Sequence, residues 1–200
     1  MERATEVDGL TLRPHRVADA EQLARLLRRD ARHLLSHGDH AAEIGTTVEE
    51  WRVQLAAQDS GDEPAYSFAM WFHTTLMVVR IVLVPVDPPR YSVGYWVTES
   101  QQGKGFATAS LRAITTYAAS LGATEVFAGV RLDNPASRRV LDRAGFVDVA
   151  DFPTYTRFWR PVGSPEQPSQ PQTGSVEPDS REKKHAAKPR VMIVARAAST

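Results

Sequence analysis

The chain contains no cysteine among its 200 residues, and this absence removes several classes of chemistry. A thiol nucleophile, a disulfide framework and a cysteine-ligated metal site are all excluded. An excess of charge of one sign is missing as well, because 24 Lys and Arg residues balance 24 Asp and Glu residues. A neutral chain has no overall electrostatic attraction to nucleic acid or to an anionic bilayer. We therefore expect neither nucleic acid nor a membrane as a partner.

Long apolar runs are also lacking. No segment approaches the ~20 apolar residues that span a bilayer. Residues 1–14 are polar and contain no apolar core of the kind found in signal peptides. Hydrophobic residues nevertheless make up 42% of the chain, enough to bury a core. These features predict a cytoplasmic enzyme or binding protein, either a monomer or a homodimer.

Aromatic residues are absent from the last part of the chain. No Phe, Trp or Tyr occurs from residue 163 onward, whereas five of the 13 prolines do. Such a segment buries too little apolar surface to offset the entropy of ordering it. We predict one folded domain at residues 1–162 and a Pro-rich disordered tail at residues 163–200. The short run VMIV near the end is interpreted as part of that tail, with docking on a sheet edge as the alternative.

Within residues 1–162, hydrophobic periodicity predicts seven strands and four helices. Their order is β α α β β β α β α β β, in which strands and helices alternate in the second half. This order implies an α/β (α+β) sheet. The predicted strands cover residues 9–16, 66–73, 76–84, 91–97, 122–132, 147–150 and 154–160, and the helices include residues 23–29, 48–58, 111–121 and 134–143.

Two of these helices have recognisable end signals. Asp19 and Gln22 have the spacing of a capping box before the first helix. In the last helix, Asn134 is a predicted N-cap, Pro135 occupies the first helical position and Gly145 lies just past the end. In the helix before it, Leu111, Ile114, Ala118 and Leu121 are spaced to share one buried face.

The stretch ESQQGKGFATASL, residues 99–111, joins a predicted strand to a predicted helix through a glycine-rich turn. A helix start offers unpaired N–H groups and the positive end of the helix dipole, so it binds anions, and glycine lets a phosphate approach the backbone. A Walker loop is excluded because Gly105 follows Lys104 where Ser or Thr is needed. A dinucleotide fingerprint is excluded because Thr108 replaces its third glycine. The stretch therefore predicts a phosphate site of another kind.

Two linked motifs resemble those of the GNAT superfamily of acyl-CoA-dependent N-acetyltransferases. The first is the segment QGKGFA, residues 102–107, preceded by GYWV and followed by TASL. The second is DNPASRRVLDRAGF, residues 133–146. The resemblance runs from about residue 9 to residue 160. It is closest to the branch typified by enzymes that acetylate the N-terminal amine of ribosomal proteins, a branch that also contains enzymes acting on small amines.

The resemblance implies a fold, a co-substrate and a reaction. The GNAT fold is a mixed central sheet of about seven strands flanked by about four helices. The co-substrate is acetyl-CoA, no metal is needed, and a primary amine of a protein N-terminus or small molecule attacks the thioester directly. In this chain the resemblance assigns the pantetheine arm to Trp96, Val97 and Thr98. It assigns the pyrophosphate to Gln102, Gly103, Lys104, Gly105, Phe106, Ala107 and Thr108.

The same resemblance suggests the catalytic groups. The backbone N–H of Val97 would stabilise the oxyanion. Asn134 and Ser137 lie three apart, so they share one face of the helix start and point toward a common ligand. We interpret both as ligands of acetyl-CoA and Ser137 as the proton donor to the leaving thiolate, with Tyr155 as the alternative donor. Each of these residues also has a purely structural interpretation. Asn134 can be a plain N-cap, Ser137 an ordinary first-turn hydroxyl and Tyr155 a core aromatic.

Some features leave alternatives open. Ser92 stands where many relatives carry a glutamate, so the base is either a water chain or unnecessary for an amine that arrives neutral. The second and third predicted strands lack a glycine turn, which leaves their register undefined. Lys104 is interpreted as a solvated residue. His33, His37 and His40 are interpreted as part of a polar helix end or loop and not as a metal site. The acidic patches Glu49–Glu50 and Asp59–Glu63 suit either a cationic substrate or solvated surface.

Three functions therefore compete. The first is an acetyltransferase acting on a primary amine. The second is an acyl-CoA-binding regulatory module that has lost turnover, which the missing glutamate at Ser92 favours. The third is an anion-binding α/β domain unrelated to CoA, and the two linked motifs argue against it.

Overall fold

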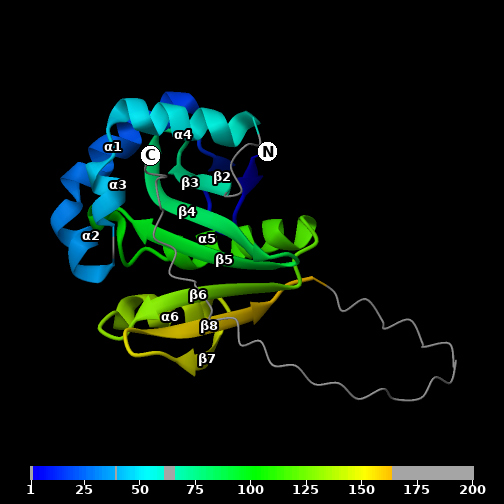
Figure 1. Ribbon diagram of the computed structural model, residues 1–200. Coiled ribbons are helices and arrows are strands. Elements are labelled where there is room, and N and C mark those ends of the chain that lie inside the picture. Colours follow the sequence, from blue (N-terminus) through cyan, green and yellow to red (C-terminus); the bar gives the residue numbers. More distant parts are fainter. Residues whose placement is uncertain (1, 39, 61–65, 164–200) are drawn as a thin grey trace, which may run out of the picture.

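The computed structural model describes residues 2–38, 40–60 and 66–163. Nearly all of the tail predicted at residues 163–200, including VMIV, lies outside the described residues, as does most of the acidic patch at Asp59–Glu63. The described residues form one sheet with helices on both faces (Figure 1). Its eight strands follow the order β1-β2-β3-β4-β5-β6-β8-β7. The strands are β1 (Arg3–Ala4), β2 (Leu10–Pro14), β3 (Tyr66–Phe72), β4 (Leu76–Asp87), β5 (Arg90–Val97), β6 (Glu125–Arg131), β7 (Val147–Asp151) and β8 (Tyr155–Pro161).

The seven predicted strands are confirmed, and the additional one is the two-residue strand β1. The structure contains more helices than the four predicted. The additional ones are two short helices, α2 and α3, between the first two predicted helices. They are too short to produce a recognisable hydrophobic periodicity. The helices are α1 (Ala20–Arg29), α2 (Ala31–His37), α3 (Ala41–Gly45), α4 (Val48–Ser60), α5 (Phe106–Ser120) and α6 (Pro135–Arg143), with single 3-10 turns η1 (Val17–Asp19) and η2 (Glu99–Gln101).

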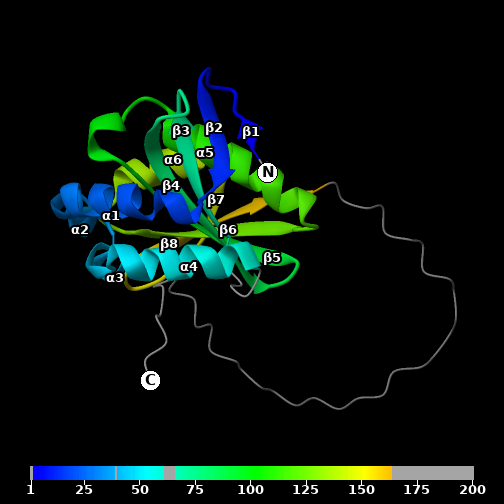
Figure 2. The same cartoon turned by 90° about the horizontal axis from the view of Figure 1, so that it is seen from above.

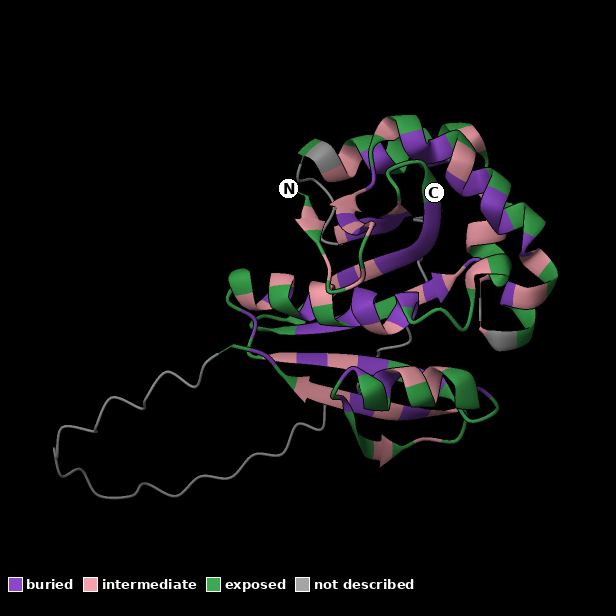
Figure 3. Ribbon diagram, turned by 180° about the vertical axis from the view of Figure 1, so that it is seen from behind, coloured by how far each residue is buried: buried purple, intermediate pink, exposed green. Residues whose placement is uncertain are grey.

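Two apolar clusters pack on opposite faces of the sheet. One joins α5 and α6 to the sheet through residues such as Leu111 and Ile114, and the other joins α1, α2 and α4 through Leu27 and Trp51. Figure 2 shows α1 and α4 on one side and α5 on the other. The central strands are buried, while the outward faces of the helices are exposed (Figure 3). Each face of the sheet therefore has its own hydrophobic core.

The end signals of α6 are confirmed, and those of α1 are not. The Asn134 side chain accepts the N–H of Ser137 at 3.0 Å, so it caps α6 as predicted. The Asp19 carboxylate instead accepts the N–H of Arg16 at 2.8 Å and pairs with both terminal nitrogens of Arg13. The predicted box with Gln22 is wrong because a stronger, charge-assisted partner on β2 holds the Asp19 carboxylate.

Two details of packing also differ from expectation. Leu121 follows the end of α5 and is exposed, although Leu111, Ile114 and Ala118 are buried as predicted. The turn between β3 and β4 uses the left-handed residue Thr74, with φ of 64°, where relatives often carry glycine. The register that the sequence left undefined pairs Phe68 with Ile81 and contains a bulge after Met70.

A buried histidine makes the fold sensitive to acid. The His15 side chain is fully buried, and burial followed by repulsion from Arg80 lowers its pKa from 6.5 to about 3. The folded protein therefore holds His15 neutral at pH values where the unfolded chain protonates it. Because the unfolded chain binds the extra proton, stability is complete above pH 6.5 and is lost as the pH falls below it.

We expect the free energy of unfolding to fall by up to about 1.4 kcal/mol per pH unit between roughly pH 6 and 4.5. Urea titrations across this range measure the slope. His15→Gln removes the titrating group and should flatten that slope whatever its effect at pH 7. The acidic groups with lowered pKa values, such as Asp19 and Glu43, act at lower pH, since they lose their contribution only when protonated. An unchanged slope in the variant would show that His15 does not cause the acid sensitivity.

Candidate functional site

The sheet opens between β5 and β6. These parallel strands pair only through Arg90–Ser92 and Glu125–Phe127, after which β5 pairs with β4 alone and β6 with β8 alone. Two cavities lie along the opening. The larger cavity has a volume of about 890 Å³ and is lined by the ends of β5 and β6, the turn before β8 and the segment between α2 and α3. The smaller cavity, of about 320 Å³, is lined by the end of β5 and the starts of α5 and α6.

The backbone of β5 presents unpaired groups to this opening. The Thr98 N–H donates to the Val78 carbonyl on β4 at 2.9 Å. In an antiparallel pair, hydrogen-bonded residues alternate with residues whose N–H and C=O point away from the partner strand. The alternation therefore directs the backbone groups of Val97, Tyr95 and Val93 away from β4, toward the side where β6 has diverged. The edge is a row of donors and acceptors available to a ligand.

The glycine-rich loop places the start of α5 on the smaller cavity. Gly103 and Gly105 have φ of 72° and 81°, and Gly105 is the N-cap of α5. A Cβ at either position would meet no atom within 4 Å. The left-handed backbone, which side chains disfavour, is thus one reason for glycine that the sequence analysis did not foresee. The first N–H groups of α5, at Phe106 and Ala107, have no partner within the helix and border the cavity.

Most of the residues predicted to bind the co-substrate line the smaller cavity. Thr98 and Lys104 are not among its lining residues. Thr98 is buried at the end of β5, and the Lys104 ammonium donates to Gln101 at 2.8 Å. The predicted residues that do line it are Trp96, Val97, Gln102, Gly103, Gly105, Phe106, Ala107, Thr108, Asn134 and Ser137.

Cationic side chains of α6 were missed from the sequence. Arg139 and Arg143 line the smaller cavity, and both lie within the second motif, where their spacing of four residues on one helix face was the available signal. On the opposite wall, the amide of Gln102 hydrogen-bonds to the imidazole of His33 on α2. The Glu99 N–H donates to the Asp30 carboxylate at 2.9 Å. These contacts fix the loop against the helices that precede it by about seventy residues.

Residues shared by both cavities mark where they meet: His40, Tyr95, Asn134 and Ser137. The Tyr95 hydroxyl is buried and has no hydrogen-bond partner in the described part of the chain, and the nearby Ser137 hydroxyl does not reach ordinary hydrogen-bond geometry. Burial raises the pKa of Tyr95 to about 12, and Ser137 opposes this shift. A neutral phenol and an alcohol therefore stand together at the junction. Tyr95 belongs to the GYWV stretch of the first motif, and no role was predicted for it.

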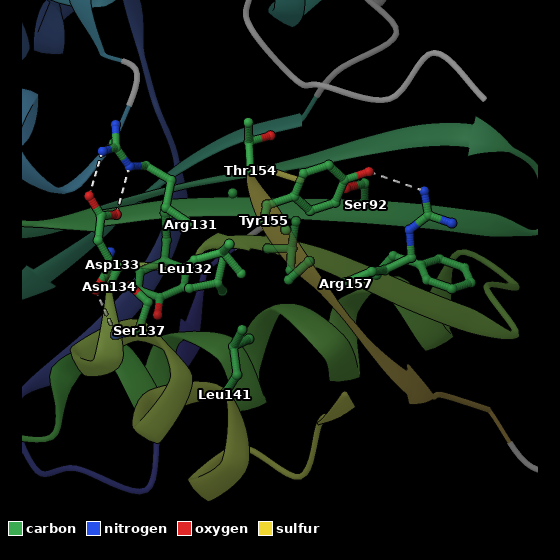
Figure 4. A pocket seen from close by; sticks show the side chains of 18 of the residues that line it. Ser92, Arg131, Leu132, Asp133, Asn134, Ser137, Leu141, Thr154, Tyr155 and Arg157 are labelled. Carbon is green, nitrogen blue, oxygen red and sulfur yellow. Dashed lines mark hydrogen bonds and ion pairs between the residues drawn. The ribbon is translucent and has the colours of Figure 1, made fainter. Parts of the chain in front are cut away.

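Tyr155 lies in the larger cavity only (Figure 4). Its ring stacks on Phe152 with 4.6 Å between centroids, and its hydroxyl accepts a hydrogen bond from Arg157 at 3.5 Å. Ser92 is buried and lines the same cavity. The two predicted proton donors thus share the larger cavity, and only Ser137 also borders the smaller one.

A charged network borders the junction from the helical side. The His40 Nδ1 lies 2.7 Å from a carboxylate oxygen of Glu43, whose other oxygen pairs with Arg80. Burial alone would raise the pKa of Glu43, but Arg80 and then His40 outweigh it, so that pKa lies below its usual range. Glu43 is therefore an ionised, partly buried carboxylate at neutral pH. His40 lies between α2 and α3, within the predicted polar helix end or loop, but its partners Glu43 and Arg80 were not predicted.

The larger cavity carries more positive than negative charge. Arg131 pairs with Asp133 at 2.6 Å, and Arg157 has no carboxylate partner among the described residues (Figure 4). The acidic residues Glu49 and Glu50 lie outside both cavities. Glu49 pairs with Arg52, and Glu50 bonds to Thr47.

In the described part of the chain no group of three or more His, Asp or Glu side chains is placed to hold a metal, and no helix is long and apolar enough to cross a membrane.

Comparison with solved structures finds the same fold. Mycobacterium smegmatis RimJ in complex with CoA-disulfide is 21% identical, covers 76% of this chain and 81% of its own, and has a TM-score of 0.66. Ribosomal-protein-S5-alanine acetyltransferase from Vibrio fischeri is 18% identical over 80% of this chain and 97% of its own, with a TM-score of 0.68. Spermidine N-acetyltransferase from Vibrio cholerae in complex with CoA and spermine is 18% identical over 78% and 97%, with a TM-score of 0.65.

No curated protein sequence matches the chain. A family model described as the acetyltransferase (GNAT) domain, however, matches residues 9–147, which include the glycine-rich loop, both walls of the smaller cavity and the start of α6. The strand opening, the helix start facing it and this match agree with the resemblance seen in the sequence. The chain belongs to the GNAT family of acetyltransferases.

Proposed function

We propose that the chain transfers the acetyl group of acetyl-CoA to a primary amine by direct attack of the amine on the thioester. The observation that carries this proposal is the meeting of two cavities at the opening between β5 and β6. One cavity has the backbone edge and helix start that suit the co-substrate, and the other is open for an acceptor. The function is assigned to residues 1–162.

The smaller cavity fits CoA by its chemistry. The first N–H groups of α5, with Arg139 and Arg143 of α6, supply positive charge for a pyrophosphate. The unpaired edge of β5 offers alternate donors and acceptors for the amides of pantetheine. The buried, unpartnered hydroxyl of Tyr95 is a further polar group that a ligand would satisfy. The CoA complexes of the RimJ and spermidine N-acetyltransferase structures, which share this fold, support the assignment.

The residues at the junction have separate tasks in this reaction. Acetyl-CoA supplies the thioester carbonyl. The Val97 N–H, on the open edge of β5, stabilises the negative charge that develops on the carbonyl oxygen. The Ser137 hydroxyl, which faces both cavities, delivers a proton to the departing sulfur. Tyr155 contacts the acceptor, and it remains the alternative proton donor.

The charge of the larger cavity limits the class of amine that it can bind as acceptor. Arg131, Arg157 and His40 border it, and its carboxylate at Asp133 is already paired. A polyamine would bring several ammonium groups into a site with no unpaired described carboxylate. The cavity therefore favours an amine with one positive charge, such as the N-terminus of a polypeptide or a small α-amino compound.

We expect acetyl-CoA to be consumed, with release of free CoA thiol, when short peptides with a free N-terminus or small α-amino compounds are supplied. The kcat/KM for spermidine should be at least ~10-fold lower, because a second buried ammonium without a partner is penalised by more than 1.4 kcal/mol. Thiol release measures the rate with each acceptor, and the mass of the product shows whether that acceptor has been acetylated. Tight acetyl-CoA binding without turnover on any amine would instead favour the regulatory module, and spermidine as the best acceptor would overturn the assignment of the cavity.

A further inference from the structure

The acceptor amine arrives as an ammonium ion and has to lose a proton before its nitrogen can attack. No carboxylate on β5 is available for this step, because Ser92 occupies the strand position where one was expected. Asp133 at the rim is held by Arg131. Among the described residues, one basic group with an available lone pair borders both cavities. That group is the imidazole of His40.

We propose that His40 is the general base of the reaction and that Glu43 is the residue that positions it. This inference rests on the acetyl transfer proposed above. It assigns a catalytic role to a residue between α2 and α3, outside both sequence motifs. Its basis is the orientation of the imidazole, its place at the junction and the charge around it.

The hydrogen bond to Glu43 fixes the orientation of the imidazole. An ionised carboxylate only accepts hydrogen bonds, so the His40 Nδ1, 2.7 Å from Glu43 Oε2, carries the proton in the neutral ring. The Nε2 atom then holds the lone pair. No hydrogen bond to Nε2 occurs in the described part of the chain, and the side chain is 23% exposed. The ring is therefore held in the tautomer that accepts a proton at Nε2, the nitrogen with no described hydrogen bond.

A close approach of backbone helps to hold the ring. A Cβ placed on Gly38 would lie 2.7 Å from His40 Nε2, which is closer than a Cβ contact allows. The backbone of Gly38 is extended, so its φ does not require glycine. The space that the missing side chain leaves is filled by the imidazole. Gly38 is thus a site at which the ring can be displaced without removing it.

Charged and titratable groups from several elements surround this pair. Arg80 on β4 pairs with Glu43 and keeps it ionised, and the neutral His15 lies beyond them. The ion pair of Arg131 with Asp133 and the neutral phenol of Tyr95 border the same cavity as His40, and His33 borders the smaller cavity. Glu43 is the negative charge in contact with the ring. It stabilises the imidazolium that forms when His40 accepts a proton.

The protons balance with this assignment. The ammonium gives one proton to His40 Nε2, and the resulting amine nitrogen bonds to the carbonyl carbon. When the carbon–sulfur bond breaks, the Ser137 hydroxyl gives its proton to the sulfur and takes up the second proton of the nitrogen in exchange. The products are an acetamide, a CoA thiol and a protonated His40. The imidazolium then releases its proton to water through the larger cavity.

The test is the pH dependence of His40→Gln measured with an α-amino acceptor whose pKa is near 8. At pH 7 its kcat/KM should fall ~10²-fold, because most of the acceptor is protonated and no base is present. At pH 9.5, where the acceptor is already neutral, the difference from the unmodified enzyme should shrink below ~5-fold. Acetyl-CoA affinity by calorimetry and the unfolding temperature should remain unchanged. Gly38→Ala should show the same pattern in weaker form.

A matched control is His73→Gln, in the turn between β3 and β4 and outside the lining of either cavity, which should retain the rate and the pH profile. An equal loss for His40→Gln at both pH values would assign the residue a purely structural role and overturn the proposal. Full activity at pH 7 would overturn it as well. An unmodified enzyme that binds acetyl-CoA but acetylates no amine would refute the proposed function itself, an outcome distinct from either of these.

Discussion

Gly105→Glu should weaken the binding of acetyl-CoA by at least ~10²-fold, equivalent to about 3 kcal/mol. Gly105 is the N-cap of α5, and its position borders the smaller cavity. A glutamate there places negative charge and bulk where the pyrophosphate should meet the first N–H groups of the helix. Isothermal titration calorimetry measures the loss. Binding that persists within ~3-fold would mean that the phosphates lie elsewhere.

The same helix offers a control for the strain of this substitution. Gly122 follows the other end of α5, has φ of 82°, and a Cβ there would also meet no atom within 4 Å. Gly122→Glu therefore introduces the same side chain into the same left-handed backbone, which costs about 1–2 kcal/mol at either place. Both variants should lose a similar amount of stability. The loss of binding should be confined to Gly105→Glu.

Ser137→Ala should lower turnover by ~10²-fold or more with little change in acetyl-CoA affinity. The structural interaction of Ser137 is made by its backbone N–H, which donates to Asn134 and is retained in alanine. The substitution therefore removes a hydroxyl at the junction while leaving the helix cap intact. Steady-state kinetics with acetyl-CoA titrated at saturating acceptor separates the effect on kcat from that on KM.

The other two hydroxyls near the reaction provide the comparison. Tyr95→Phe removes the buried phenol beside Ser137, and Tyr155→Phe removes the phenol that Arg157 contacts in the larger cavity. Tyr155→Phe should alter the KM for the acceptor more than kcat. If Ser137→Ala keeps full turnover while one of these variants loses it, that tyrosine is the proton donor and the thiolate lies closer to it than proposed.

The fold was predictable from the sequence where the signals are local. The cap at Asn134, the apolar faces of the strands and the glycine turn each depend on neighbouring residues, and these elements are confirmed. Asp19 was misread because its partner, Arg13, lies on the preceding strand and outcompetes the local cap. The short helices α2 and α3 have too few turns for a periodic signal.

The two cavities of the candidate site also differ in how far their residues could be predicted from local sequence. The residues proposed to hold acetyl-CoA come from two contiguous motifs, so their grouping could be predicted. His40 lies 55 residues before Tyr95, and the two residues line the same cavities only because α2 and α3 fold over the opening in the sheet. Its bond to Glu43 is local, but the pairing of Glu43 with Arg80 on β4 is not. The spacing of His33, His37 and His40 in the sequence does not indicate the contacts that His40 and Glu43 make.

The divergence of β5 from β6 also bears on how such a protein changes over evolutionary time. Beyond Ser92 and Phe127, the edge of β5 offers its own N–H and C=O groups to the ligand. Every amino acid except proline carries both groups, so recognition through them tolerates substitution of the side chains around it. Lineages with this architecture can therefore replace most of their residues and still bind the same donor. Under the proposed function, side chains of the larger cavity recognise the acceptor, so a few replacements there should redirect the enzyme to another amine.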